Sequence, residues 1–126
     1  MAKLSKGYKD DAGVDIILDR DIVFQPKQIT AFNLGVSITP KKNRMAVIAP
    51  RSSYAKKGLL ICNCPVDAHY VGDIHAIVYN GSDEPVVCKK NESFCQIMMI
   101  KIQTIKNVEI RKKGKRKFGN FGSTGG

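Results

Sequence analysis

Hydrophobic positions along the chain come in short runs rich in β-branched residues, and clusters of polar turn residues separate these runs. No stretch keeps the 3.6-residue period of a long amphipathic helix, and no segment is repeated. Short strands at this spacing are typical of an all-β sandwich or barrel and not of alternating strands and helices. The pattern predicts strands at residues 14–18, 22–24, 36–38, 46–48, 74–79, 86–88 and 96–102.

One segment predicts a short helix at residues 52–58, because Ser52 is a good N-cap and Gly58 is a natural C-terminal stop. The end of the chain differs from the rest, since glycine and small polar residues there cannot bury a face. We therefore expect a β domain over residues 1–115 and a flexible C-terminal lid over residues 116–126.

A length of 126 residues and a hydrophobic fraction of 43% fit one folded domain. No apolar run approaches the roughly 18 residues that cross a bilayer. The first residues also lack an apolar segment of signal-peptide length. We expect a protein without a membrane partner, located in the cytoplasm, or in the host-cell cytoplasm if its source is a virus or phage.

The net charge of +10 is concentrated near the C-terminus. Residues 101–118 hold eight basic residues and one acidic residue, so they supply +7 of the total. A basic block of this kind favours a polyanion partner: nucleic acid, an anionic membrane or a polyphosphate.

The four cysteines, at positions 62, 64, 88 and 95, lack the paired spacing of a zinc site, and we expect mostly buried thiols.

Three segments carry candidate chemistry. Arg51, Ser52 and Ser53 at the start of the predicted helix form a plausible anion site, although a pair of serines there is more often a simple cap. Asp67 follows an apolar run, and its carboxylate serves either as a general base or as a turn cap, with the turn favoured on local grounds. The glycine-rich tail holds Arg116, which can clamp a phosphate, and Phe121, which offers a flat face to a base.

Neither G-x-x-x-x-G-K-[ST] nor G-x-G-x-x-G occurs, which argues against a P-loop kinase and a dinucleotide-binding oxidoreductase. The candidate segments, in this order, resemble instead the five ordered motifs of the trimeric dUTP diphosphatase (dUTPase) family. The counterparts are residues 12–16 (AGVDI), 50–53 (PRSS), 66–72 (VDAHYVG), 95–97 (CQI) and 116–125, ending in FGSTG.

The resemblance implies a jelly-roll-like β-barrel or sandwich, the β-clip fold, assembled as a homotrimer with C-terminal strand exchange. It implies hydrolysis of dUTP to dUMP and diphosphate, which keeps uracil out of DNA and supplies dUMP for dTMP synthesis. Each active site would combine motifs one, two and four with motif three and the tail from different subunits. Mg²⁺ would bridge the substrate phosphates, with no direct protein ligand.

The resemblance also implies roles for single residues. Asp67 would activate the attacking water, Tyr70 would pack on the deoxyribose and exclude a 2′-hydroxyl, and Asp15 would orient waters of the metal. The remaining implied substrate-binding residues are Arg51, Ser52, the main chain of Ser53 and Gln96 for the α- and β-phosphates; Arg116, Ser123 and Thr124 for the γ-phosphate; Phe121 and Gly122 of the tail at the uracil; and Cys64, Val66 and His75 around the base pocket.

One departure concerns the base. The family usually has glycine where this chain has Cys64, and Pro65 follows without an N–H, so we expect a narrower or reshaped uracil pocket.

The nearest alternative is a dCTP deaminase or bifunctional enzyme of the same fold, which lacks the FGSTG ending. A single-stranded nucleic-acid-binding β-barrel is less favoured, because the positive charge is too localised for a long groove. A catalytically altered relative that only binds remains a third alternative, against which Asp67, Gln96 and Arg116 argue.

Overall fold

The computed structural model describes residues 2–5, 7, 12–103, 105, 109 and 111. Within these residues the chain forms nine β-strands and one short helix. The elements, in chain order, are β1 (Lys3–Ser5), β2 (Val14–Ile17), β3 (Ile22–Phe24), β4 (Ile29–Ser37), β5 (Arg44–Pro50), α1 (Ser52–Ala55), β6 (Leu59–Ile61), β7 (Asp73–Asn80), β8 (Val86–Cys88) and β9 (Cys95–Lys101).

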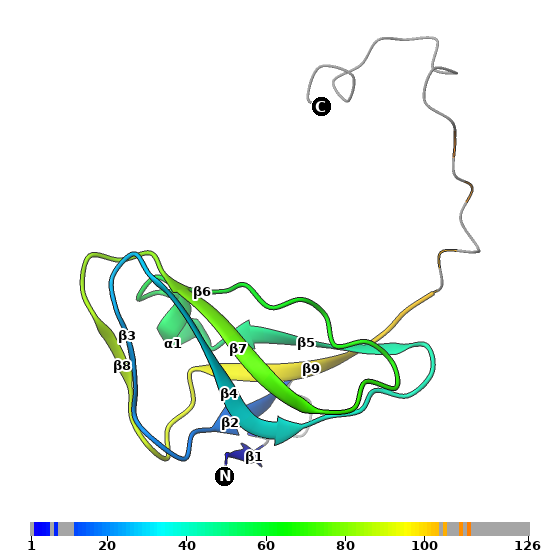
Figure 1. Cartoon of the computed structure of the whole chain (residues 1–126), viewed down its shortest axis with the longest axis horizontal. Helices are drawn as coiled ribbons and strands as arrows, with labels where there is room; N and C mark the ends of the chain where they lie inside the picture. The colour runs from blue at the N-terminus through cyan, green and yellow to red at the C-terminus, as the bar shows by residue number, and fades with distance from the viewer. Residues whose placement is uncertain are drawn as a thin grey trace.

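The strands form three antiparallel sheets with the orders β1-β2-β9-β5, β3-β8 and β4-β7-β6. In Figure 1 the β4-β7-β6 sheet lies across the sheet that contains β5 and β9, and the β3-β8 ribbon stands to one side of both. Apart from β1-β2 and β6-β7, the paired strands are not consecutive in sequence, as expected for a β-sandwich and not for a simple meander. The all-β prediction is confirmed.

The core lies between the sheets and is built around touching aromatic rings. Phe24 and Phe94 meet edge to face with ring centroids 5.0 Å apart, and Phe32 lies about equally far from both, at 6.2 Å and 6.0 Å. Tyr54 of α1 joins the cluster at 6.5 Å from Phe94. Edge-to-face pairs of buried rings add stability beyond the apolar area that they bury. The cluster therefore fixes α1, and the chain just before it, against the sheets.

Several strands differ from the pattern-based prediction. The bounds of β3 and β8 agree with it, whereas β4 begins at Ile29, seven residues earlier than the predicted start. The pairing of β4 with β7 shifts register between Asn33 and Ser37, where Gly35 adopts a φ of +75°. A glycine readily takes this conformation, which lets the long strand bend without ending.

The helix is shorter than predicted, and its cap is different. The N-cap residue is Arg51, which has extended backbone angles and makes no side-chain capping hydrogen bond, so the expected Ser52 cap is wrong. Gly58 does end this segment, with a φ of +101°. Ser52 and Ser53 are therefore the first two helical residues, and both are exposed.

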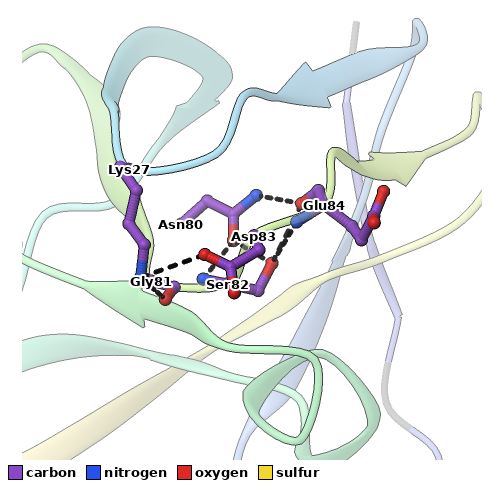
Figure 2. A network of polar contacts seen from close by, with 6 residues as sticks. All are labelled: Lys27, Asn80, Gly81, Ser82, Asp83 and Glu84. Atoms are coloured by element: carbon purple, nitrogen blue, oxygen red, sulfur yellow. Dashed lines mark hydrogen bonds and ion pairs between the residues drawn. The ribbon is translucent and has the colours of Figure 1, made fainter.

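A polar network closes the turn between β7 and β8 (Figure 2). The buried Asn80 donates through Nδ2 to the carbonyls of Phe24 and Glu84, at 2.8 Å each. Its Oδ1 accepts hydrogen bonds from the main chain and the hydroxyl of Ser82, at 2.9 Å and 2.7 Å. Leaving a buried amide unpaired is costly, so the Asn80 side chain keeps all of these hydrogen bonds. The bond to Phe24 joins the turn to β3.

The expectation of mostly buried cysteines is half right. Cys88 and Cys95 are fully buried, whereas Cys62 and Cys64 are exposed, because they leave the sheet in the loop after β6.

The described part of the chain contains no helix with the length and apolar character needed to cross a bilayer.

Candidate active site

The structure places five of the predicted site residues, together with Gly13 of the first motif, in one group formed by β2, β9 and the start of α1. Asp15 of β2 lies directly opposite Gln96 of β9 in the strand register, and Gln96 in turn lies opposite Ala49 of β5. Arg51 follows the end of β5, and its Nε lies 3.7 Å from Oδ1 of Asp15. We call Gly13, Asp15, Arg51, Ser52, Ser53 and Gln96 the Arg51 cluster.

The main chain of Arg51 is held by the neighbouring segment, since its N–H donates to the carbonyl of Phe94 at 2.8 Å. The carbonyl of Arg51 accepts the N–H groups of Tyr54 and Ala55, both at 2.9 Å. This leaves the N–H groups of Ser52 and Ser53 without a main-chain acceptor among the described residues, as at any helix start. Two free N–H groups, two hydroxyls and a guanidinium side by side suit a phosphate.

Gly13 leaves space for Gln96. A Cβ on Gly13 would lie 2.6 Å from Oε1 of Gln96 and 3.2 Å from its Cβ. Real Cβ atoms essentially never approach another atom to 2.6 Å. The glycine of the first motif therefore determines where the amide of the fourth motif lies.

Burial shapes the base of this cluster. Cys95 precedes Gln96 and is fully buried; burial raises the pKa of its thiol, and the nearby Cys88 and Asp15 add to the effect. Burial likewise raises the pKa of the Tyr54 hydroxyl under α1, where the Lys57 ammonium lies 4.8 Å from its ring centroid. Both groups therefore stay neutral at ordinary pH, and we assign them a role in core packing and not in catalysis.

A second group lies in the loop between β6 and β7, residues 62–72, which we call the Asp67 loop. Val66 is buried and pairs with Ala46 of β5 through two main-chain hydrogen bonds of 2.8 Å and 3.0 Å. Asp67 follows it and is exposed. Among the described residues, no side chain forms a hydrogen bond or an ion pair with the Asp67 carboxylate. The carboxylate is therefore exposed, directly after a residue that is anchored to β5.

Tyr70 packs back on its own loop. Its ring is 42% exposed, and its hydroxyl donates to the carbonyl of Asp73 at 3.1 Å. A Cβ on Gly72, whose φ is +140°, would lie only 3.0 Å from that hydroxyl. The glycine therefore allows the close approach that holds the ring in place. Cys64 and His75, the other predicted residues near the base pocket, are both exposed on the same hairpin.

The Arg51 cluster and Asp67 lie toward opposite ends of β5. Val66 pairs with Ala46 near the start of the strand, whereas Gln96 lies opposite Ala49 and Arg51 follows Pro50 at its end. Four residues of extended strand separate Ala46 from Pro50, which is about 13 Å. Because Asp67 continues away from the cluster, the distance between them is larger still. Figure 1 shows the β6–β7 connection running along β5 toward the end opposite α1.

Five predicted residues lie outside the described part of the chain. They are Arg116, Phe121, Gly122, Ser123 and Thr124. The predicted domain boundary at residue 115 falls there too and stays a prediction.

Sequence reasoning missed Asn63, whose side chain bridges the Asp67 loop to β7. Its Nδ2 donates to the carbonyl of His75 at 2.6 Å, and its Oδ1 accepts the N–H of Ile77 at 2.8 Å. The available signal was an asparagine two residues after the apolar run at 59–61, a position where its amide can substitute for main-chain pairing.

The described residues offer oxygen donors suited to Mg²⁺, chiefly the carboxylate of Asp15. They contain no group of three or more histidine, cysteine, aspartate or glutamate side chains placed to hold a metal ion. This donor set fits an ion held mainly by a polyphosphate and water, and it does not form a complete protein cage.

Comparison with known proteins places this arrangement in a family. The dUTPase family profile matches residues 1–125. A deoxyuridine 5′-triphosphate nucleotidohydrolase of Clostridium tetani is 32% identical, over 98% of this chain and 90% of its own length. A Pol polyprotein of caprine arthritis encephalitis virus is 30% identical over 93% of this chain, and a related polyprotein of ovine maedi visna related virus is 26% identical over 92%. The chain spans 11% of the length of these two viral relatives.

Solved structures share the fold. The native EIAV dUTPase matches with a TM-score of 0.77 at 23% identity, covering 90% of this chain and 92% of its own. The Staphylococcus bacteriophage 80alpha dUTPase with dUPNHPP matches at 0.75 and 19% identity, covering 96% and 90%. A mutant dUTPase of phage phi11 of S. aureus, described with a structural Mg(II) ion, matches at 0.73 and 17% identity, covering 92% of both chains. These likenesses confirm the predicted jelly-roll-like β-clip fold, and with the match over residues 1–125 they show that the chain belongs to the dUTPase family.

Proposed function

We propose that this protein hydrolyses dUTP to dUMP and diphosphate, with each active site completed by neighbouring subunits of a homotrimer. Family membership supports the reaction. The separation of the Arg51 cluster from Asp67 supports the shared site, because both are assigned to the α-phosphate, and one phosphate cannot lie toward both ends of β5 in one subunit. A copy in trimeric symmetry would bring the Asp67 loop of one subunit to the Arg51 cluster of the next.

In this mechanism the Arg51 cluster grips the α- and β-phosphates through the guanidinium, the exposed N–H groups and the Gln96 amide. Phosphoryl transfer depends mostly on positioning and charge stabilisation, so these donors supply much of the catalysis. Asp67, exposed and without an ion-pair partner among the described residues, accepts the proton of the water that attacks the α-phosphorus. Tyr70, held by Asp73 and Gly72, forms the wall that a 2′-hydroxyl would strike.

Mg²⁺, when bound, neutralises charge on the substrate phosphates. Asp15 is the described residue that we assign to its water shell, and the ion pair with Arg51 positions that carboxylate. Arg116, Phe121, Ser123 and Thr124 are assigned to a lid that covers the triphosphate and the base, supplied by a third subunit after C-terminal strand exchange. We propose that the protein acts in the cytoplasm, or in the host-cell cytoplasm if its source is a virus or phage, because the proposed substrate belongs to the pool of DNA precursors.

The first experiment measures diphosphate release from dUTP, dCTP, dTTP and UTP with Mg²⁺. We expect turnover of dUTP far above the other three. Equal turnover of UTP and dUTP would contradict the role of Tyr70, and ammonia released from dCTP would favour the deaminase alternative.

The second experiment tests the shared site with two inactive variants. Asp67→Asn and Arg51→Ala subunits, each with its own affinity tag, are co-expressed and purified over both tags. In every mixed trimer one of the three subunit junctions combines an intact Asp67 with an intact Arg51, so activity returns to about a third of the wild-type rate. If each site lay within one subunit, the mixed trimers would stay inactive.

A further inference from the structure

Main-chain pairing between β6 and β7 stops early. The ladder joins Leu59–Ile61 to Val78–Asn80, and one more hydrogen bond follows, from the N–H of Cys62 to the carbonyl of Ile77 at 2.7 Å. Among the described residues, residues 63–65 make no main-chain hydrogen bond to any other segment. The chain is next anchored only at Val66, which pairs with β5 and not with β7. A three-residue opening therefore separates the loop from β7.

The side chain of Asn63 spans this opening. It donates to the carbonyl of His75 and accepts from the N–H of Ile77, so it uses both polar ends of its amide on one edge of β7. These two main-chain groups are ones that a continuing strand would have engaged. The Asn63 amide thus pairs with the main chain of β7 in place of a strand. The length of this side chain sets the distance between residues 63–65 and β7.

The opening exposes an unpaired main-chain edge next to the proposed catalytic residues. Cys64 and Pro65 are exposed, and the N–H of Cys64 and the carbonyls around it lack main-chain partners among the described residues. An N–H beside carbonyls can pair with the edge of uracil, on which the N3–H lies next to carbonyl oxygens. Asp67 and Tyr70 follow within a few residues on the same loop.

We propose that Asn63 is a positioning residue for base recognition, which holds the 63–65 segment away from β7 and keeps the pyrimidine-binding opening at a fixed width. The inference rests on the proposed function, because it requires a nucleotide base at this hairpin. Without the Asn63 amide, the His75 carbonyl and the Ile77 N–H must find water or draw the loop inward. Either change alters the opening for the base, whereas among the described residues no hydrogen bond joins the Asn63 side chain to the Arg51 cluster.

The test separates base binding from phosphate binding. Asn63→Ala removes both hydrogen bonds, and the near-isosteric Asn63→Asp keeps the acceptor for Ile77 while losing the donor to His75. Two probes are titrated: dUpNHpp, which carries uracil and phosphates, and inorganic triphosphate, which carries phosphates alone. The control is Ser82→Ala, which also removes side-chain hydrogen bonds from a turn, at the far end of β7.

We expect both Asn63 variants to weaken dUpNHpp binding about tenfold or more, as for the loss of one or two hydrogen bonds with rearrangement of the loop. Inhibition by inorganic triphosphate should stay at the wild-type level, KM for dUTP should rise more than kcat falls, and the preference for dUTP over dCTP should shrink. Ser82→Ala should lower Tm without changing the ratio of the two affinities. If Asn63→Ala does not fold, Asn63→Asp carries the same comparison.

The proposal is overturned if both probes weaken in parallel, which indicates a general structural role, or if neither changes. A wild-type protein that hydrolyses no dUTP would instead remove the proposed function. If the wild-type protein hydrolyses dUTP and the Asn63 variants bind dUpNHpp as tightly as it does, only this inference is removed.

Discussion

Gly13 and Gln96 lie so close that the hydrogen of the glycine is the largest group the space between them accepts. A methyl group on Gly13 would lie 2.6 Å from Oε1 of the Gln96 side chain. The obstructed atom is the far end of a flexible side chain, so the fold can yield by moving it. The two residues come from motifs that are 83 positions apart in the sequence, 13 and 96.

Gly13→Ala should therefore reduce activity more than stability. The Gln96 amide must rotate away from its place beside Asp15 and Arg51, and we expect kcat/KM for dUTP to fall about 10²-fold, as for a lost donor at a developing charge. Tm should change little. Gly81→Ala is the matched control, because its methyl group would meet its nearest neighbours at an ordinary 3.5 Å. Steady-state kinetics and thermal melts on both variants test this; an unchanged kcat/KM in Gly13→Ala would contradict the placement of Gln96.

Asp67→Asn should abolish turnover while leaving the protein folded and able to bind substrate. The amide cannot accept the proton of the attacking water, and general-base loss costs about 10²- to 10⁴-fold in kcat. Binding of dUpNHpp should be equal or tighter, because a negative charge beside the triphosphate has been removed. Calorimetric titration and a diphosphate-release assay measure the two effects. Asp83→Asn, which affects only an exposed contact with Lys27 at 3.8 Å, should retain wild-type kcat.

Deletion of residues 117–126 tests the proposed lid. We expect kcat/KM to fall by about 10² or more, since several phosphate donors and the stacking Phe121 are lost together. Sedimentation should show the same oligomeric state as the full chain. Deletion of Gly126 alone, beyond the motif, should have no effect. A truncated protein with a wild-type rate would remove the lid from the mechanism.

Stability should decline in alkaline solution because of the buried thiols. Burial raises the pKa of Cys95 and of Cys88 above the ordinary value of 9.0, so the folded state holds protons that the unfolded chain releases from about pH 9 upward. Their contribution is complete below pH 9 and is lost as the pH rises toward the folded-state pKa, with a limiting slope of about 1.4 kcal/mol per pH unit for each group.

Urea unfolding between pH 7 and 10.5 measures this slope. Cys95→Ala should reduce the alkaline decline, although it lowers stability at every pH by leaving a cavity. Val78→Ala, at another fully buried position without a titrating group, should lower stability while keeping the wild-type slope. Equal slopes in the wild type and Cys95→Ala would mean that the Cys95 thiolate is tolerated in the folded protein.

Periodicity predicted the all-β class because strands such as β3 and β8 are continuous β-branched runs that end at turn residues. It missed β1, whose three residues are all exposed, because pairing with β2 there depends on main-chain hydrogen bonds and not on burial. The Ser52 cap failed because the helix begins one residue earlier than the serine cap requires. Arg51 has the extended backbone angles of an N-cap residue, so Ser52 is already the first helical residue.

The site was predictable only in part. Asp15, Arg51 and Gln96 were grouped by their resemblance to a motif set, and the structure brings them together on adjoining strands. No local pattern indicates that Asp67 lies at the other end of β5, because that separation follows from the single pairing of Val66 with Ala46. Asn63 was missed because its role depends on where β7 lies beside it, which is a tertiary relationship.

The placement of the two half-sites at opposite ends of β5 has a consequence for how the protein behaves in dilute solution. If the site is shared as we propose, a lone chain is catalytically silent, so specific activity should collapse on dilution below the concentration at which chains associate. Small molecules that wedge between chains would then inhibit without resembling a nucleotide.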